Sequence, residues 1–260
     1  MKTGNYDILL KDKSIKVFWS TPDNIDNNTK VLFVMHGCLR NADKYIETWK
    51  ILSELDNVIV IVPEFKKIEY SKYEYNYINI LKNNEVVSYD DWTFNIIDLI
   101  FKDFINRFNL STKKYILCGH SAGGQFSHRT MLFSNSVFLD YVIAINSGSY
   151  TVLDESKNYP YGIKNLENYK NIIANNLSKK MYILVGDLDN DPNHKYFPKD
   201  LEFEFQGKNR FERANYFYNT SKNYCDKNKM PFNWKLVTMK DVKHQGKDAI
   251  KYVLDIIKSK

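Results

Sequence analysis

Short apolar runs alternate along this chain with longer segments whose apolar positions recur at helical spacing. The apolar runs predict buried strands over Val31–Met35, Val58–Val62, Tyr115–Cys118, Tyr141–Ile145, Met181–Val185 and Trp234–Met239. Helical spacing predicts helices over Asp43–Leu55, Asp91–Phe108, Gln125–Phe133 and Gly246–Lys258. Because strands that are apolar throughout are covered on both faces, the pattern predicts an α/β fold with a mostly parallel central sheet and helices on both faces.

The first thirty residues follow a different pattern. Apolar residues at Tyr6–Leu10 and Ile15–Trp19 flank the polar segment Lys11-Asp12-Lys13-Ser14, which predicts an antiparallel hairpin at the N-terminus. No linker or internal repeat divides the chain, so residues 1–260 are predicted to form one α/β domain.

Three long connections, over residues 64–90, 147–164 and 188–206, follow predicted strands. Connections above about 15 residues are usually functional or disordered, and ligands of parallel sheets bind at the carboxyl ends of the strands. We therefore expect these connections to wall a pocket. The first one carries Tyr70, Tyr73, Tyr75 and Tyr77, for which ordinary packing is the alternative.

Composition narrows the function classes. The 260 residues are 43% hydrophobic and 26% charged, as in a globular protein, and carry a formal net charge of +6. The lysines are scattered, which favours solvated faces over a nucleic-acid surface. Three cysteines, Cys38, Cys118 and Cys225, do not form a disulfide framework. The N-terminus does not resemble a signal peptide and no apolar stretch reaches about 18 residues, so we expect a cytoplasmic protein without a membrane partner.

The most informative motif is Gly119-His120-Ser121-Ala122-Gly123, placed between a predicted strand and a predicted helix. This is the pattern of a nucleophile elbow, a tight turn that exposes one serine above the sheet. The turn brings positions 119 and 123 almost into contact, which explains the glycines, and it strains the serine backbone by about 1–3 kcal/mol. A plain glycine-rich turn is the alternative interpretation.

A serine hydroxyl needs a base that takes its proton and an acid that orients this base. In folds with such an elbow the acid and then the histidine follow the serine along the chain. His244 comes directly after the last predicted strand and is our candidate base for Ser121. His194 lies in a polar loop and is expected at the surface, and His128 falls on the helix after the elbow.

The acid should follow the predicted strand Met181–Val185. Asp187, Asp189 and Asp191 all lie in the loop that starts there. Asp189 is far enough past the strand to turn back toward the histidine, whereas Asp187 and Asp191 could cap the turn or face solvent. We therefore favour Asp189 and keep the other two aspartates as alternatives.

Two backbone amides are needed to hold the oxyanion that forms when a serine attacks a carbonyl. The residue after the nucleophile, Ala122, supplies one, and the loop after the strand Val31–Met35 supplies the other. In that loop Gly37 allows close approach, and the amide of Cys38 is our choice. The Cys38 thiol as nucleophile is the competing hypothesis.

No metal-ligand spacing and no nucleotide-binding motif occurs in the sequence, so neither a metal nor a cofactor is expected.

With these motifs the chain resembles the α/β-hydrolase superfamily, and within it the serine esterases similar to polyhydroxybutyrate depolymerases and feruloyl esterases. The resemblance rests on five segments: His36-Gly37-Cys38, the elbow through Phe126, Gly186-x-x-Asp189, Gln206–Phe211 and His244 after a final strand. It implies an α/β-hydrolase fold and ester hydrolysis by Ser121, Asp189 and His244. The sequence shows none of the signal peptide, appendages and disulfides of secreted depolymerases, which favours a small soluble ester or a short oligomer over a polymer.

The motifs together predict a serine hydrolase that cleaves a small-molecule carboxylic ester through an acyl-enzyme on Ser121. A peptidase or an acyltransferase could use the same three residues, because the pocket sets the leaving group and the acceptor. A binding protein that keeps the fold without catalysis is the alternative from another class. The sequence carries no signal for the oligomeric state.

Overall fold

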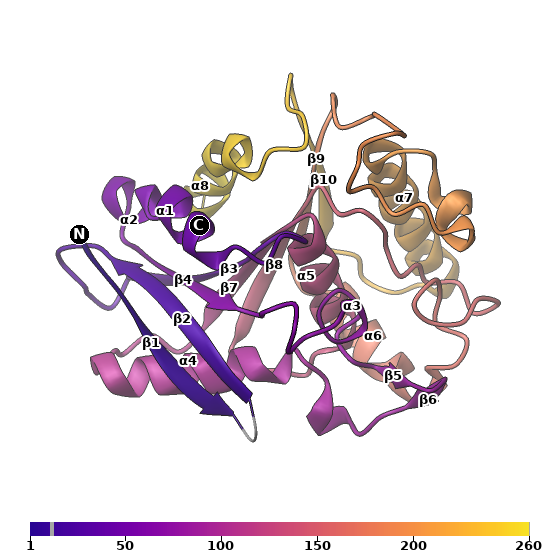
Figure 1. Cartoon of the computed structure of the whole chain (residues 1–260). Coiled ribbons are helices and arrows are strands. Elements are labelled where there is room, and N and C mark those ends of the chain that lie inside the picture. The colour runs from indigo at the N-terminus through magenta and orange to yellow at the C-terminus, as the bar shows by residue number, and fades with distance from the viewer. Residues whose placement is uncertain (11–12, 260) are drawn as a thin grey trace.

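The computed structural model describes residues 1–10 and 13–259, and Figure 1 shows their arrangement. The strands of the main sheet are β1 (Lys2–Leu10), β2 (Lys13–Thr21), β3 (Lys30–Met35), β4 (Val58–Glu64), β7 (Tyr115–His120), β8 (Leu139–Ile145), β9 (Met181–Gly186) and β10 (Trp234–Met239). In the described residues they form one sheet in the order β1-β2-β4-β3-β7-β8-β9-β10. From β4 to β10 all neighbouring strands are parallel. The mostly parallel sheet is therefore confirmed.

The N-terminal hairpin is also confirmed. β1 pairs antiparallel with β2, which pairs antiparallel with β4 and joins the hairpin to the parallel strands. Both strands extend beyond the predicted ranges, and Lys13 and Ser14, expected in the turn, belong to β2. The other two residues of the predicted turn, Lys11 and Asp12, lie outside the described residues.

Helices cover both faces of the sheet (Figure 1). They are α1 (Ala42–Trp49), α2 (Ile51–Leu55), α3 (Lys72–Tyr75), α4 (Asn95–Phe108), α5 (Ala122–Phe133), α6 (Lys170–Leu177), α7 (Arg210–Asn228) and α8 (Ile250–Lys258). Helices α1, α2 and α8 pack on one face, and α4, α5, α6 and α7 pack on the other. Successive side chains of a strand point to opposite faces, so Phe33 of β3 lies in one core and Val34 in the other.

Several predicted helix boundaries need correction. The segment Asp43–Leu55 divides into α1 and α2 at Lys50, and α4 begins at Asn95, four residues after the predicted start. Before α8 the chain forms a single 3₁₀ turn over Gly246–Ala249, in keeping with the poor helix propensity of glycine.

Helices α6 and α7 were not predicted. The buried residues of α7 recur at helical spacing, but they include two arginines and a serine: Arg210, Arg213, Ala214, Phe217, Ser221 and Cys225. A search for apolar periodicity does not detect such a face.

The first long connection is largely ordered into α3 and a small hairpin of β5 (Leu81–Lys82) and β6 (Glu85–Val86). Tyr70, Tyr75 and Tyr77 are buried in the core on the α5 face, whereas Tyr73 is exposed. Packing therefore accounts for three of the four tyrosines. None of the helices within the described residues is both long enough and apolar enough to span a membrane.

Candidate active site

The turn from β7 into α5 has the geometry expected of a nucleophile elbow. Ser121 has φ 57° and ψ −113°, a conformation rare for a residue with a side chain. A Cβ atom built on Gly119 would lie 2.2 Å from the carbonyl oxygen of Gly123, and one built on Gly123 would lie 2.1 Å from that of Met35. Both positions therefore require glycine, and the turn is pressed against the end of β3.

The structure brings Ser121, His244 and Asp189 into one hydrogen-bonded chain. His244 Nε2 lies 3.0 Å from Ser121 Oγ, and His244 Nδ1 lies 2.7 Å from Asp189 Oδ2. The side chains of His244 and Asp189 are 10% and 2% exposed, so their hydrogen bond is shielded from water. Such an imidazole can accept the serine proton at Nε2 while the carboxylate fixes the Nδ1–H tautomer.

The other two candidate aspartates do not contact His244. Asp191 Oδ1 accepts a hydrogen bond from the amide of Asn193 at 2.8 Å, as in an Asx turn, and the residue is exposed. Asp187 has a buried Oδ1 without a hydrogen-bond partner within the described residues. The geometry therefore favours Asp189 among the three.

The loops that carry the acid and the base are tied together behind the site. The amide of Leu188 donates to the carbonyl of Val242 at 3.1 Å, and a Cβ on Gly186 would lie 2.1 Å from that same oxygen. The side chain of Asn146, at the end of β8, accepts from the amide of Gly186 at 2.9 Å and donates to the carbonyl of Lys243 at 3.3 Å. Asn146 thus joins both loops, a role that the sequence analysis did not assign.

The surroundings of His244 favour its neutral form. Burial lowers the pKa of this imidazole, the hydrogen bond to Asp189 opposes the shift, and the positive charge of Arg210 adds to it. A neutral imidazole is the form that can act as a base toward Ser121.

The two predicted oxyanion amides lie beside the serine. The amide of Ala122 begins α5, and a Cβ on Gly37 would lie 3.8 Å from the Cβ of Ser121, which places the Gly37–Cys38 turn against the nucleophile. Within the described residues neither the Ala122 amide nor the Cys38 amide donates to a backbone carbonyl. Amides without a backbone acceptor, at the start of a 12-residue helix and in the adjoining turn, are suited to bind a negative oxygen.

The thiol of Cys38 is in a poor setting for a nucleophile. Burial raises the pKa of this thiol, although Arg210, Arg40 and Lys67 partly oppose the shift. A protonated thiol is not nucleophilic. The environment therefore disfavours the competing hypothesis of a cysteine nucleophile.

His194, expected at the surface, is half-exposed, and it also contacts the candidate base. Its ring packs edge-on against His244 at a centroid distance of 4.9 Å and an interplanar angle of 68°. The ring of His120 lies 4.8 Å from that of His244, centroid to centroid. The mostly exposed loop 188–206 thus contacts the candidate base through both Asp189 and His194.

The sequence analysis also missed Arg210, at the first position of α7. Arg210 Nη1 donates to Asp189 Oδ1 at 3.1 Å, and both side chains are nearly inaccessible. The stretch Gln206–Phe211 was noted for its resemblance but without a role. Gln206 in that stretch bonds the amide and the carbonyl of Tyr150 at 3.0 and 2.7 Å, which fixes the loop after β8.

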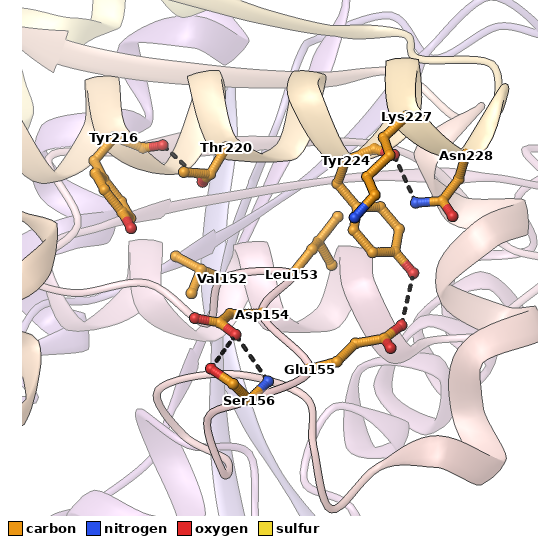
Figure 2. Close-up of a pocket in the computed structure, with 10 residues that line it drawn as sticks. All are labelled: Val152, Leu153, Asp154, Glu155, Ser156, Tyr216, Thr220, Tyr224, Lys227 and Asn228. Atoms are coloured by element: carbon orange, nitrogen blue, oxygen red, sulfur yellow. Dashed lines mark hydrogen bonds between the residues drawn. The ribbon is translucent and has the colours of Figure 1, made fainter.

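The described residues contain no group of three or more His, Cys, Asp or Glu side chains able to hold a metal ion. The cavity in Figure 2, of about 400 Å³, lies between residues 152–156 and α7 and is not lined by Ser121 or His244. Its polar groups are largely paired: Asp154 bonds Ser156, and Glu155 bonds Tyr224 and Lys170. This cavity is therefore separate from the candidate triad.

No protein-family model and no curated protein matches this sequence. Solved structures do match it. Poly(aspartic acid) hydrolase-1 from Sphingomonas sp. KT-1 superposes with a TM-score of 0.92 at 29% identity over 98% of both chains. The poly(3-hydroxybutyrate) depolymerase from Bordetella parapertussis superposes with a TM-score of 0.92 at 24% identity, over 98% of this chain and 89% of the other.

The chain therefore has the α/β-hydrolase fold. A fluorophosphonate-binding serine hydrolase from Staphylococcus aureus shares the fold more distantly, with a TM-score of 0.60 at 15% identity over 99% and 97% of the chains. The expected resemblance to depolymerase-like serine hydrolases is therefore confirmed. The Sphingomonas neighbour, at 29% identity, is a hydrolase, which supports hydrolase activity for this chain as well.

Proposed function

We propose that this α/β-hydrolase cleaves carboxylic esters through an acyl-enzyme on Ser121. The observation that carries the proposal is the two-sided hydrogen bonding of His244, with Nε2 at 3.0 Å from Ser121 Oγ and Nδ1 at 2.7 Å from Asp189 Oδ2. These distances lie within the range in which a base takes a proton directly.

In the first half of the reaction, His244 Nε2 removes the proton of Ser121 as Oγ attacks the carbonyl carbon. The carbonyl oxygen becomes an oxyanion, which the amides of Ala122 and Cys38 hold. Asp189 stabilises the imidazolium that forms next to it. The imidazolium then gives its proton to the leaving alcohol, and the acyl group stays on Ser121.

In the second half, His244 takes a proton from water, and the resulting hydroxide attacks the acyl-enzyme through a second oxyanion. The proton returns to Ser121 as the carboxylic acid leaves, so the enzyme ends as it began. The two amides serve both halves, because the oxyanion forms at the same place each time.

Fluorophosphonate labelling and the turnover of short-chain nitrophenyl esters test this proposal. The wild type should label once and turn the esters over, whereas Ser121→Ala should not label and should lose about 10⁴–10⁶-fold in kcat. Ser111→Ala, at an exposed serine in the loop before β7, is a matched control that should behave as the wild type. Equal activity in wild type and Ser121→Ala, or a folded wild type that does not label, would contradict the proposal.

Amide hydrolysis is a second candidate, favoured by one observation. The Sphingomonas neighbour, 29% identical, is a hydrolase of poly(aspartic acid), whose links are amides. The same serine, histidine and carboxylate can cleave either bond, but an amine leaves only after it has been protonated. Nitrophenyl esters and matched anilides with one acyl group separate the two candidates by their kcat/KM values.

A further inference from the structure

The guanidinium of Arg210 makes two directed contacts at the candidate triad. Nη1 donates to Asp189 Oδ1 at 3.1 Å, on the carboxylate oxygen that His244 does not use. Nη2 donates to His194 Nδ1 at 3.4 Å. The side chain is 1% exposed, and within the described residues Oδ1 of Asp189 accepts no other hydrogen bond. Within the described residues Arg210 therefore bonds the acid directly and forms no hydrogen bond with Ser121.

Arg213, one turn along α7, shows what a buried arginine does when it is structural. It is also 1% exposed, but it donates to backbone carbonyls, those of Gly207 at 2.9 Å and Gly148 at 2.8 Å. A buried charge is costly unless it is paired and hydrogen-bonded. Both buried arginines are hydrogen-bonded. The partners of Arg213 are backbone carbonyls, whereas those of Arg210 are the carboxylate of Asp189 and the imidazole of His194.

We propose that Arg210 is a positioning residue for the reaction. Its Nη1 holds the carboxylate of Asp189 in the plane of the His244 ring, while His194 fixes Nη2, the other arm of the forked guanidinium group. The inference rests on the proposed function, because it concerns the geometry of the same triad. A carboxylate bound at one oxygen can rotate about its Cβ–Cγ bond, and binding of the second oxygen stops this rotation. The planar fork of arginine suits two acceptors at a fixed angle, which an ammonium group does not.

His194 acts here as a neutral acceptor. Its Nδ1 receives Arg210 Nη2 and also the amide of Tyr196 at 3.3 Å, so the ring proton is on Nε2. Burial and the charge of Arg210 lower the pKa of His194, in keeping with this form. The same ring contacts that of His244, so the loop 188–206 and α7 meet at the triad.

The charge of Arg210 has a second consequence, for the pH profile. The titratable and charged groups around His244 are Asp189, Asp191 and His194 from the loop 188–206, Arg210 from α7, and His120 from β7. Among them Arg210 is the buried cation, and its charge lowers the pKa of His244. Loss of that charge should move the acidic limb of the kcat/KM profile to higher pH.

Three variants test the positioning role. Arg210→Met removes both the charge and the planar guanidinium group. It should lower kcat by about 10- to 100-fold, the size expected for a misplaced catalytic group. It should also raise the kinetic pKa, that is, the pKa read from the acidic limb of the kcat/KM profile. Arg210→Lys keeps the charge without the fork, and should keep the low kinetic pKa with an intermediate kcat. Arg213→Met is the matched control, a buried arginine of the same helix, and should leave the kinetic pKa unchanged.

The pair His194→Ala and His194→Asn tests the second arm at a partly exposed position where folding is less at risk. Both remove the ring that contacts His244, but Asn offers an oxygen near the place of Nδ1. We expect His194→Asn to retain several-fold more kcat than His194→Ala. Equal values for the two variants would overturn the part of the proposal that concerns His194.

Fluorophosphonate labelling of the wild type is measured first, because its failure would refute the proposed function and not this inference. If the wild type labels, an Arg210→Met variant with the wild-type pH profile and a kcat within threefold would overturn the role of Arg210. If Arg210→Met does not fold, Arg210→Lys decides: a kcat equal to that of the wild type would overturn the need for the fork.

Discussion

The two halves of the candidate triad are built by different means. On the serine side, the turn at Ser121 is shaped by backbone contacts, with Gly119 against Gly123 and Gly123 against Met35. On the acid side, Asp189 is held by the buried, oppositely charged side chain of Arg210 and by its hydrogen bond with His244. Steric contacts do not depend on pH or salt, whereas a buried ion pair fails when either partner is lost. The two sides should therefore respond differently to the same kind of change.

The largest effect that separates the two sides is expected from Asp189→Asn. An amide at this position presents the wrong hydrogen-bonding group to His244 Nδ1, and comparable changes lower kcat by about 10³–10⁴-fold. It also leaves Arg210 without its counter-charge, which should lower the free energy of unfolding by about 3–5 kcal/mol. Ester kinetics and urea denaturation measure the two losses.

Asp191→Asn is the control for this change, because Asp191 lies in the same loop, is exposed and does not contact His244. It should retain the activity and the stability of the wild type. An equal loss of kcat in both variants would mean that Asp189 is not the acid that orients His244.

On the serine side, an added side-chain atom should destabilise the fold by steric overlap instead of by loss of a charge. Gly123→Ala tests this directly. The new Cβ would lie 2.1 Å from the carbonyl oxygen of Met35, a backbone atom that cannot move without displacing β3. We expect a loss of about 4 kcal/mol in the free energy of unfolding, in the range of strongly overpacked sites. Urea denaturation followed by circular dichroism measures it.

Gly4→Ala serves as the control, since the three atoms nearest to its Cβ would all belong to the side chain of Trp19 on the edge strand pair. This variant should lose much less stability than Gly123→Ala. Similar losses in the two variants would contradict a backbone origin of the elbow constraint.

The same contrast explains what could be predicted from the sequence. The elbow was predictable because its motif spans only five residues and Gly119 meets Gly123 within it, although Gly123 also meets the distant Met35. The strands were predictable because they are apolar throughout. Arg210 was not, because its partner Asp189 lies 21 residues away and an arginine at a helix start looks like a solvated residue. Helix α7 was missed for the same reason, since its buried face includes Arg210, Arg213 and Ser221.

His194 and Asn146 were missed because their roles depend on where a loop returns. A polar loop such as 188–206 gives no periodic signal, so its contact with His244 follows from packing and not from local pattern. Asp189 was favoured over its neighbours by distance from the strand, and its contact with His244 agrees with that choice.

The steric contacts of the serine side do not depend on pH, but three buried histidines near them do, so acid should lower the stability of the protein. Burial lowers the pKa of His36 to about 3 and holds those of His120 and His128 well below their ordinary value of 6.5. The unfolded chain therefore binds these protons as the pH falls below about 6.5, and the folded chain does not. Between pH 7.5 and pH 5.5 each histidine therefore lowers the free energy of unfolding by about 1.4 kcal/mol, and the three together lower it by about 4 kcal/mol.

Urea denaturation at pH 7.5 and pH 5.5 measures this loss. His128→Asn should reduce the difference between the two pH values by about one third, because an amide does not titrate in this range. An unchanged pH dependence in that variant would show that His128 is protonated in the folded protein.

The smallest effect is expected where the two sides meet, at Asn146. Its side chain accepts from the amide of Gly186 and donates to the carbonyl of Lys243, so it fixes the loop of the acid relative to the loop of the base. In Asn146→Ala the buried Gly186 amide loses its acceptor, which should cost about 1–3 kcal/mol in the free energy of unfolding. Asn146→Asp keeps an acceptor for that amide but not the donor to Lys243, so it should fall between wild type and Asn146→Ala in stability. If the loop contact matters for the reaction as well, kcat should follow the same order, whereas a stability loss without any change in kcat would show that the two loops keep their geometry without this residue.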